Sequence, residues 1–225
     1  MPFTYDPRLK GSGYRDTTTG RVISRVNVGE QVDVMISNSS DVTLTLSEMV
    51  DTGGISSQAW YDAMRQEIKD NYIDQYLVGI GGREQMTPAD WGSVGGMVAD
   101  QYRYLNDFHD QVSAGDLSQA QINARSRMYI NSSREAYERA QARAPGRGYT
   151  EHQWVNSPIA DTCEDCVALQ GSGWISVDEA FISPSTGEDA VPGSGATICL
   201  TNCHCNIQYR SVSYTHLTLP TTPYV

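Results

Sequence analysis

The five cysteines of the chain all lie between positions 163 and 205, in two short motifs. Cys163 and Cys166 form a C-x-x-C pair, and Cys199, Cys203 and Cys205 form a C-x-x-x-C-x-C cluster. Both thiolates of a C-x-x-C turn can point to the same side, and a second turn can supply the other corners of a tetrahedron around Zn²⁺, at Zn–S distances of about 2.3 Å. The spacing therefore predicts that two loops converge on one zinc ion.

Five cysteines exceed the ligands of a tetrahedral site by one, so the pattern leaves the ligand set open. The first-choice ligands are Cys163, Cys166, Cys203 and one of Cys199 or Cys205. His204 could substitute, but it lies between two cysteines and is expected to point away from them. The alternatives are two disulfides with a spare thiol, or unligated buried cysteines. An odd count of cysteines and the lack of a signal peptide argue against disulfides, and reduced thiols at this spacing are more often metal ligands.

The composition limits the partners that the chain is expected to have. It has 225 residues, with 16 Lys plus Arg against 27 Asp plus Glu and a formal net charge of -11. That length suits one or two domains. An acidic surface repels phosphates, so direct nucleic-acid binding is not expected. No apolar run approaches the roughly 18 residues that span a bilayer, and the sequence predicts a soluble, cytoplasmic-type protein with no membrane role.

Both ends of the chain differ from the rest. Residues 1–26 are polar and rich in Gly and Thr, which predicts an N-terminal arm with a short hairpin or an extended strand near Tyr14–Ile23. At the other end, Val212–Thr221 looks like the read-through translation of a transposase-based sequencing-library adapter. Residues 211–225 are therefore expected not to be native, and the natural sequence is expected to stop near Arg210.

Residues 27–146 predict a helical domain. Asn27 with Glu30 three positions later resembles a helix start, although Ser37–Ser40 is expected to interrupt this helix and Val42–Leu46 alternates like a strand. Ser56 or Ser57 is expected to cap a second helix, whose apolar residues recur every four positions. Its predicted buried face comprises Trp60, Met64, Ile68, Tyr72, Tyr76 and Ile80.

A third helix has the clearest start in the chain, with Thr87 as N-cap and Pro88 in the first helical position. Its predicted buried face comprises Trp91, Val94, Val98, Leu105, Phe108 and Val112. The glycines in its first turns are expected to allow close helix–helix approach, and these are Gly92, Gly95 and Gly96. A fourth helix is predicted over 118–142, and Pro145–Gly146 is the predicted domain boundary.

The charges divide the chain at this boundary. The basic residues concentrate before it, at Arg125, Arg127, Arg134, Arg139, Arg143 and Arg147. No Lys or Arg occurs between Gly148 and Tyr209, so residues 147–210 are interpreted as a separate cysteine-rich, metal-binding module. The arginines are either a solvated helix face or a patch that meets an acidic partner, such as the cysteine module of a neighbouring subunit.

The sequence carries no motif that would make the cysteines catalytic. The H-x-E of zinc deaminases is absent, as are H-E-x-x-H, G-x-S-x-G and a Walker loop. Redox use of the C-x-x-C would need a βαβ setting, which the pattern does not predict. A structural zinc ion that supplies folding energy to a small module is the favoured role. The strongest rival is a zinc-dependent hydrolase or nuclease-like enzyme with Asp161, Glu164, Asp165 or His152 beside the metal, and a nucleic-acid-binding zinc knuckle is opposed by the missing basic residues.

Several motifs together point to one family. In the cysteine module they are Trp154, Asp161–Cys166, Leu169–Gly171, Pro192–Gly193 and Asn202–Cys205, and in the helical part they are Gly81–Gly82, Thr87–Trp91, Gln101–Leu105 and Arg127–Tyr129. On these motifs residues 50–210 resemble the phage head morphogenesis proteins of the Mu F-like minor head protein family. His204 stands where the family ending usually has Arg, and Cys199 lies one residue before the place where the family commonly has His.

The resemblance implies a function as well as a fold. A member of this family would be a minor virion component near the portal, acting in head assembly or DNA packaging, with no established catalytic residue. Its partners would be the portal and capsid proteins, with self-association in addition, and it would reside in the virion after assembly in the host cytoplasm. The expected fold is mainly α, with a helical N-terminal domain followed by a small loop-rich cysteine module that resembles a zinc knuckle.

Overall fold

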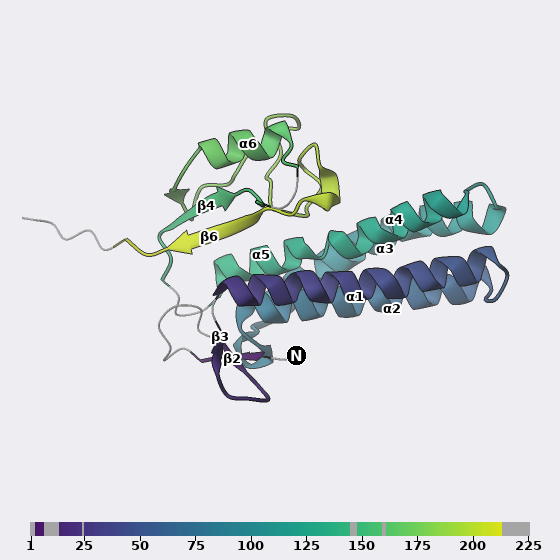
Figure 1. Ribbon diagram of the computed structural model, residues 1–225, viewed down its shortest axis with the longest axis horizontal. Helices are drawn as coiled ribbons and strands as arrows, with labels where there is room; N and C mark the ends of the chain where they lie inside the picture. The colour runs from purple at the N-terminus through teal and green to yellow at the C-terminus, as the bar shows by residue number, and fades with distance from the viewer. Residues whose placement is uncertain (1–2, 7–13, 24, 145–147, 159–160, 213–225) are drawn as a thin grey trace, which may run out of the picture.

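The computed structural model describes residues 3–6, 14–23, 25–144, 148–158 and 161–212. The fold is mainly α, as predicted, and its long helices lie side by side in a bundle below a smaller C-terminal module (Figure 1). The bundle helices are α1 (Arg25–Asp51), α2 (Ser57–Ile80), α3 (Pro88–Ala114), α4 (Gln119–Asn131) and α5 (Arg134–Arg143). A short 3-10 helix, η1 (Arg83–Gln85), lies between α2 and α3. Helices α4 and α5 follow one another along the bundle and together lie beside the other long helices.

Helix α2 is the centre of the bundle core. The six residues of its predicted stripe, Trp60 to Ile80 at every fourth position, are all fully buried. Ser56 is the N-cap, and its hydroxyl accepts a hydrogen bond from the backbone N–H of Ala59 at 3.1 Å. Helix α2 ends at Gly81, whose φ of 103° lies in the left-handed region that glycine adopts without strain. The predictions for this helix are confirmed.

Helix α3 begins as predicted, with a complete capping box between Thr87 and Asp90. The expected role of its glycines is wrong: a Cβ added at Gly92, Gly95 or Gly96 would meet nothing within 4 Å. The close approach lies instead at Gly79 of α2, where an added Cβ would come within 2.6 Å of the Cβ of Ala140 in α5.

Helix α1 is continuous from Arg25 to Asp51, so the predicted start at Asn27, the interruption at Ser37–Ser40 and the strand-like segment Val42–Leu46 are all wrong. The buried face continues through Thr43 and Ser47, which are fully buried. The Ser47 hydroxyl donates to the Thr43 carbonyl at 2.8 Å and lies 2.9 Å from the hydroxyl of Ser126 in α4. Small residues with hydroxyl groups thus occupy core positions, and a hydrophobicity pattern classes these positions as polar and therefore exposed.

The single helix predicted over 118–142 is two helices, because the chain turns at Ser132 and Ser133. Both serine hydroxyls donate to carbonyls three residues earlier, at 2.9 Å and 2.7 Å. They also accept hydrogen bonds from α2, from the Tyr72 hydroxyl at 2.7 Å and from the side-chain amide of Asn71 at 3.0 Å. Side-chain hydrogen bonds of this kind compete with the helical ladder, and the contacts with α2 fix the break.

The described part of the N-terminal arm folds onto the bundle. Strands β1 (Phe3–Tyr5), β2 (Tyr14–Asp16) and β3 (Val22–Ile23) form an antiparallel sheet, in which β2 and β3 are the predicted hairpin. Tyr14 is buried between this sheet and the bundle, and its hydroxyl donates to the carbonyls of Val78 and Gly79 in the last turn of α2.

The C-terminal module contains regular structure that the sequence pattern did not predict. Its elements are β4 (Glu151–Val155), α6 (Glu164–Gly171), β5 (Ile175–Ser176), the 3-10 turn η2 (Leu200–Asn202) and β6 (Asn206–Arg210). The strands form an antiparallel sheet in the order β5-β4-β6, with Trp154 opposite Ile207. Trp154 is fully buried in a small core together with three of the cysteines. The predicted boundary at Pro145–Gly146 lies outside the described residues.

The module packs against α4 and α5 (Figure 1). The side-chain amide of Asn131 donates to Asn202 at 2.8 Å, and the Tyr209 hydroxyl donates to the Glu138 carbonyl at 3.3 Å. Arg139 forms an ion pair at 3.4 Å with Asp189 of the module. The basic helix face thus contacts the acidic module within the same chain. Other arginines of this face pair inside the bundle, Arg134 with Asp33 and Arg143 with Asp90, whereas Arg147 lies outside the described residues.

Candidate metal centre

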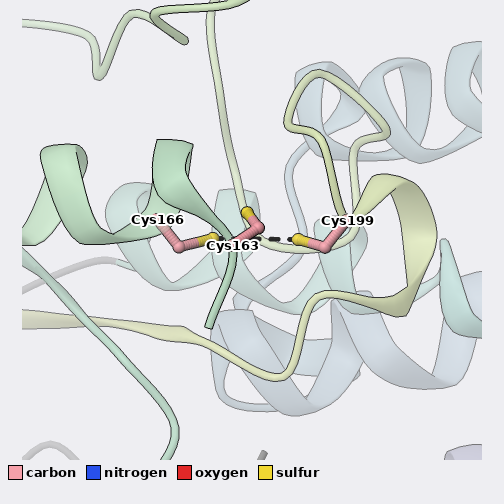
Figure 2. A group of neighbouring side chains, drawn as sticks. All are labelled: Cys163, Cys166 and Cys199. Carbon is pink, nitrogen blue, oxygen red and sulfur yellow. Dashed lines mark hydrogen bonds between the residues drawn. The ribbon is translucent and has the colours of Figure 1, made fainter. Parts of the chain in front are cut away.

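Helix α6 positions the first cysteine pair. Cys163 is the N-cap residue of this helix and Cys166 lies in its first turn. The backbone N–H of Val167 donates to the Cys163 carbonyl at 3.1 Å, which closes the turn. Figure 2 shows the sulfurs of both cysteines close to that of Cys199 at the start of the helix. The N-terminus of a helix also stabilises thiolates, because its unpaired N–H groups favour negative charge.

The turn η2 positions the second pair. Cys199 precedes this turn and Cys203 follows it, as N-cap and C-cap residues. Leu200 has a φ of 52°, the only positive φ at a non-glycine residue among the described positions. This left-handed conformation costs a leucine of the order of 1 kcal/mol. The hydrogen bond from the Leu200 N–H to the Thr197 carbonyl, at 2.8 Å, holds the chain in this tight reversal.

The five predicted cysteines come together. All are free thiols, so the alternative of two disulfides does not occur. Their sulfurs fall into two groups that share Cys166, namely Cys163, Cys166 and Cys199, and Cys166, Cys203 and Cys205, each with its sulfurs within 4.8 Å of one another. The Cys166 sulfur lies 3.7 Å from that of Cys199 and 3.8 Å from that of Cys203.

These separations fit a metal site. Four thiolates at about 2.3 Å from a zinc ion are about 3.8 Å apart, which matches the two measured distances from Cys166. Within the described part of the chain, no histidine or carboxylate joins either group. The clustered cysteines could therefore hold a metal ion with sulfur ligands alone.

Hydrogen bonds among the sulfurs shift the pKa values of four of the thiols. The hydrogen bond with Cys203 lowers the pKa of Cys199 to about 5, and hydrogen bonds with Cys166 and Cys203 lower the pKa of Cys205 to about 3. Hydrogen bonds with Cys166, Cys199 and Cys205, together with burial, raise the pKa of Cys203. At Cys166 the hydrogen bond with Cys203 lowers the pKa, but that with Cys205 and burial outweigh it, and the pKa is raised. Metal binding must therefore release protons from the inner thiols.

Asp165 connects the two turns, a role that the sequence pattern does not predict. This carboxylate is buried, and its Oδ2 accepts hydrogen bonds from the hydroxyls of Ser185 at 2.6 Å and Ser183 at 3.2 Å and from the backbone N–H of Ile198 at 2.9 Å. The hydroxyl of Ser185, followed by the backbone N–H of Ile198 and the hydroxyl of Ser183, lowers the pKa of Asp165. In the sequence, only its position between the two cysteines of the C-x-x-C motif indicates that Asp165 supports the metal site.

The other residues considered beside the metal lie elsewhere. His204 is exposed and, as expected, does not join the sulfurs. The Nε2 atom of His152 lies 2.9 Å from the Glu179 carbonyl, and its ring stacks on Phe181 with centroids 4.5 Å apart. Burial lowers the pKa of His152, with the Glu179 carbonyl opposing this shift. His152 is thus a residue of the small core of the module. Asp161 and Glu164 are exposed.

The C-x-x-C is flanked by a strand and a helix after all, because β4 precedes it and α6 follows. However, β4 pairs antiparallel with both of its neighbours, so the parallel βαβ unit of thioredoxin-like proteins is not formed here. The expectation that this redox setting is missing therefore agrees with the sheet topology.

Comparison with protein-family models, with curated proteins and with solved structures finds no match to this chain. The resemblance to the phage minor head family is therefore carried by its motifs alone. Among the helices in the described part of the chain, none combines the length and the apolar character that crossing a membrane would require.

Proposed function

We propose that the chain is a structural protein of a phage head, a minor head component near the portal, whose C-terminal module is held together by a zinc ion. The observation that carries the zinc site is the convergence of five free thiols from two turns. Zinc sites with four cysteine ligands are structural, because no coordination position is left for a substrate. The phage assignment is supported by the motifs of the cysteine module and of the helical domain.

The module would need a bound zinc ion for its stability because its own hydrophobic core is small. Its three strands and one short helix enclose few large apolar side chains, among them Trp154, Phe181 and Leu169. A core of this size contributes little free energy of folding, whereas metal binding to preformed ligands contributes several kcal/mol. The metal would also hold η2 in the conformation in which Asn202 contacts Asn131 of α4. Zinc would thereby fix the module on the bundle.

The contacts of the acidic residues and His152 favour this role over a zinc-dependent hydrolase or nuclease-like enzyme. All three hydrogen bonds to Asp165 come from the module itself, and His152 is packed against Phe181. Neither residue joins the groups of sulfurs. The head protein would instead act through contacts with the portal and capsid proteins and with further copies of itself, in the virion and, during assembly, in the host cytoplasm.

Metal content tests the zinc site. We expect about one zinc per purified chain by mass spectrometry, with thiols that react with a maleimide only after a chelator is added. Hydrogen exchange should then increase across 148–212, while α2 remains protected by the bundle core. A chain that contains no metal and has freely reactive thiols would contradict the proposed structural zinc site.

The phage role is tested in virions. We expect peptides of this chain in purified particles of the phage that encodes it, at a much lower copy number than the major capsid protein. A Cys203→Ser change should reduce the yield of filled heads, and Tyr104→Phe on the exposed face of α3 is the matched control. Absence of the chain from particles, together with an unchanged yield of filled heads, would contradict the assignment.

A further inference from the structure

Each of the two turns at the cluster is bounded by a pair of cysteines. Cys163 and Cys166 lie at the first turn of α6, and Cys199 and Cys203 lie at the two ends of η2. Backbone hydrogen bonds close both turns, at 3.1 Å to the Cys163 carbonyl and at 3.1 Å to the Cys199 carbonyl. Each pair is therefore held by a turn that constrains both sulfurs, which is the arrangement of two metal-binding knuckles.

Cys166 joins the two pairs. Its sulfur is 3.7 Å from Cys199 and 3.8 Å from Cys203, and Cys163 lies within 4.8 Å of both Cys166 and Cys199. Figure 2 shows the sulfurs of Cys163, Cys166 and Cys199 gathered in the space between α6 and the loop that carries Cys199. These three sulfurs form one face of a tetrahedron, and Cys203 lies at the distance from Cys166 that the fourth corner requires.

The sulfur of Cys205 lies within 4.8 Å of those of Cys166 and Cys203, but this cysteine lies outside both turns. Along the extended chain that leads into β6, Cys203, Cys205, Ile207 and Tyr209 are buried at alternate positions, so Cys205 continues the core face of that strand. Its sulfur contacts the side-chain amide of Asn156, 3.6 Å from Oδ1. Cys205 is buried, as are Cys166 and Cys203, whereas Cys163 and Cys199 are half-buried.

We propose that Cys163, Cys166, Cys199 and Cys203 are the four metal ligands and that Cys205 stays outside the coordination sphere. This inference rests on the proposed zinc site and assigns its ligands. Each turn contributes two thiolates, and together they complete a tetrahedral site. The fifth cysteine then has a role in the core of the module, and the odd number of cysteines is explained without a second metal.

Cobalt substitution of the full chain tests the assignment, because the thiolate-to-metal charge-transfer absorption scales with the number of sulfur ligands. We expect Cys205→Ser to bind Co²⁺ and Zn²⁺ with affinities within about threefold of wild type and with an unchanged spectrum. Cys199→Ser should lose about a quarter of the charge-transfer intensity and at least about 100-fold in Zn²⁺ affinity, more than the loss of an outer-shell group causes. The reverse pattern for these two variants would overturn the assignment.

A second pair of variants covers a failure of the serine variants to fold. Because imidazole is a zinc ligand, Cys199→His should bind Zn²⁺ more tightly than Cys199→Ser, with one fewer thiolate in the cobalt spectrum. Cys205→Val keeps the core position filled and should retain the wild-type spectrum, and loss of a thiolate band in this variant would show Cys205 to be a ligand. A wild-type chain that binds neither Zn²⁺ nor Co²⁺ would overturn the proposed zinc site itself, a result distinct from a different ligand set.

Discussion

The Oδ2 atom of Asp165 accepts a hydrogen bond from the backbone N–H of Ile198 at 2.9 Å, and this bond links the two turns that carry the cysteines. Asp165 lies between Cys163 and Cys166, and Ile198 immediately precedes Cys199. A buried carboxylate therefore links the two knuckles. Outer-shell groups of this kind orient ligands and adjust the affinity of a site.

The first prediction concerns this carboxylate. Asp165→Asn removes the charge that strengthens the hydrogen bonds to Ser185 and Ile198, so we expect Zn²⁺ affinity to fall by about 10- to 100-fold. Competition with a chromophoric chelator measures this change. Glu164→Gln is the matched control, because this neighbouring carboxylate is exposed. An Asp165→Asn chain with wild-type affinity would show that the linkage does not organise the ligands.

The second prediction concerns the contact between α2 and α5. Gly79→Ala places a Cβ within 2.6 Å of the Cβ of Ala140 and against the Tyr137 carbonyl, so the helices must move apart. We expect the free energy of unfolding to fall by about 1–3 kcal/mol. Gly95→Ala in α3 is the control. Its Cβ meets nothing within 4 Å, so it should stabilise the helix by up to about 1 kcal/mol.

Urea denaturation of the two alanine variants measures both effects. Equal unfolding free energies for the variants would contradict the close packing at Gly79. A destabilised Gly95→Ala chain would instead place an unrecognised neighbour beside α3.

The third prediction concerns the end of α2. The last carbonyls of a helix lack intrahelical partners, and the Tyr14 hydroxyl donates to those of Val78 and Gly79. Tyr14→Phe keeps the ring but leaves these buried carbonyls without this donor, so we expect a loss of about 1 kcal/mol in the free energy of unfolding. Faster hydrogen exchange in β2 should accompany it. The control Tyr104→Phe changes a side chain that is 61% exposed, and an equal effect in both variants would exclude a specific role for Tyr14.

The elements that could be predicted from the sequence are those whose signals are local. The capping box at Thr87 and the four-residue spacing from Trp60 to Ile80 depend on neighbouring residues only, and both predictions are confirmed. The convergence of the five cysteines was predictable too, because short motifs with fixed spacing determine how thiols can point.

The remaining features depend on contacts between distant segments. The Ser47 hydroxyl can lie in the core because the Ser126 hydroxyl of α4 lies 2.9 Å from it, and the pattern in α1 therefore predicted a strand wrongly. The break between α4 and α5 requires Asn71 and Tyr72 of α2. The glycine that matters for packing is Gly79, opposite Ala140, and its neighbour is distant in the sequence. Asp165 likewise acquires its role from Ser183, Ser185 and Ile198, after a loop that carries no regular motif.

The last prediction concerns the dependence of the module on pH. Burial holds the pKa of His152 below its ordinary value of 6.5, and the nearby Glu179 and Asp189 oppose this shift only in part. The unfolded chain therefore binds a proton at a higher pH than the folded chain does. Stability is fully present above about pH 6.5 and decreases as the pH falls from there toward the lower folded-state pKa.

We expect the free energy of unfolding of the zinc-saturated chain to decrease between pH 7.5 and 5.5, as measured by urea titrations with a probe in the module (pH values chosen about one unit either side of the ordinary pKa). His152→Gln supplies the control, because glutamine can still donate to the Glu179 carbonyl but does not titrate. Metal ligands also bind protons in this range, so the difference in slope between wild type and His152→Gln isolates the histidine. Parallel slopes would show that His152 is protonated equally in the folded and unfolded chains, and would contradict the effect of its burial against Phe181.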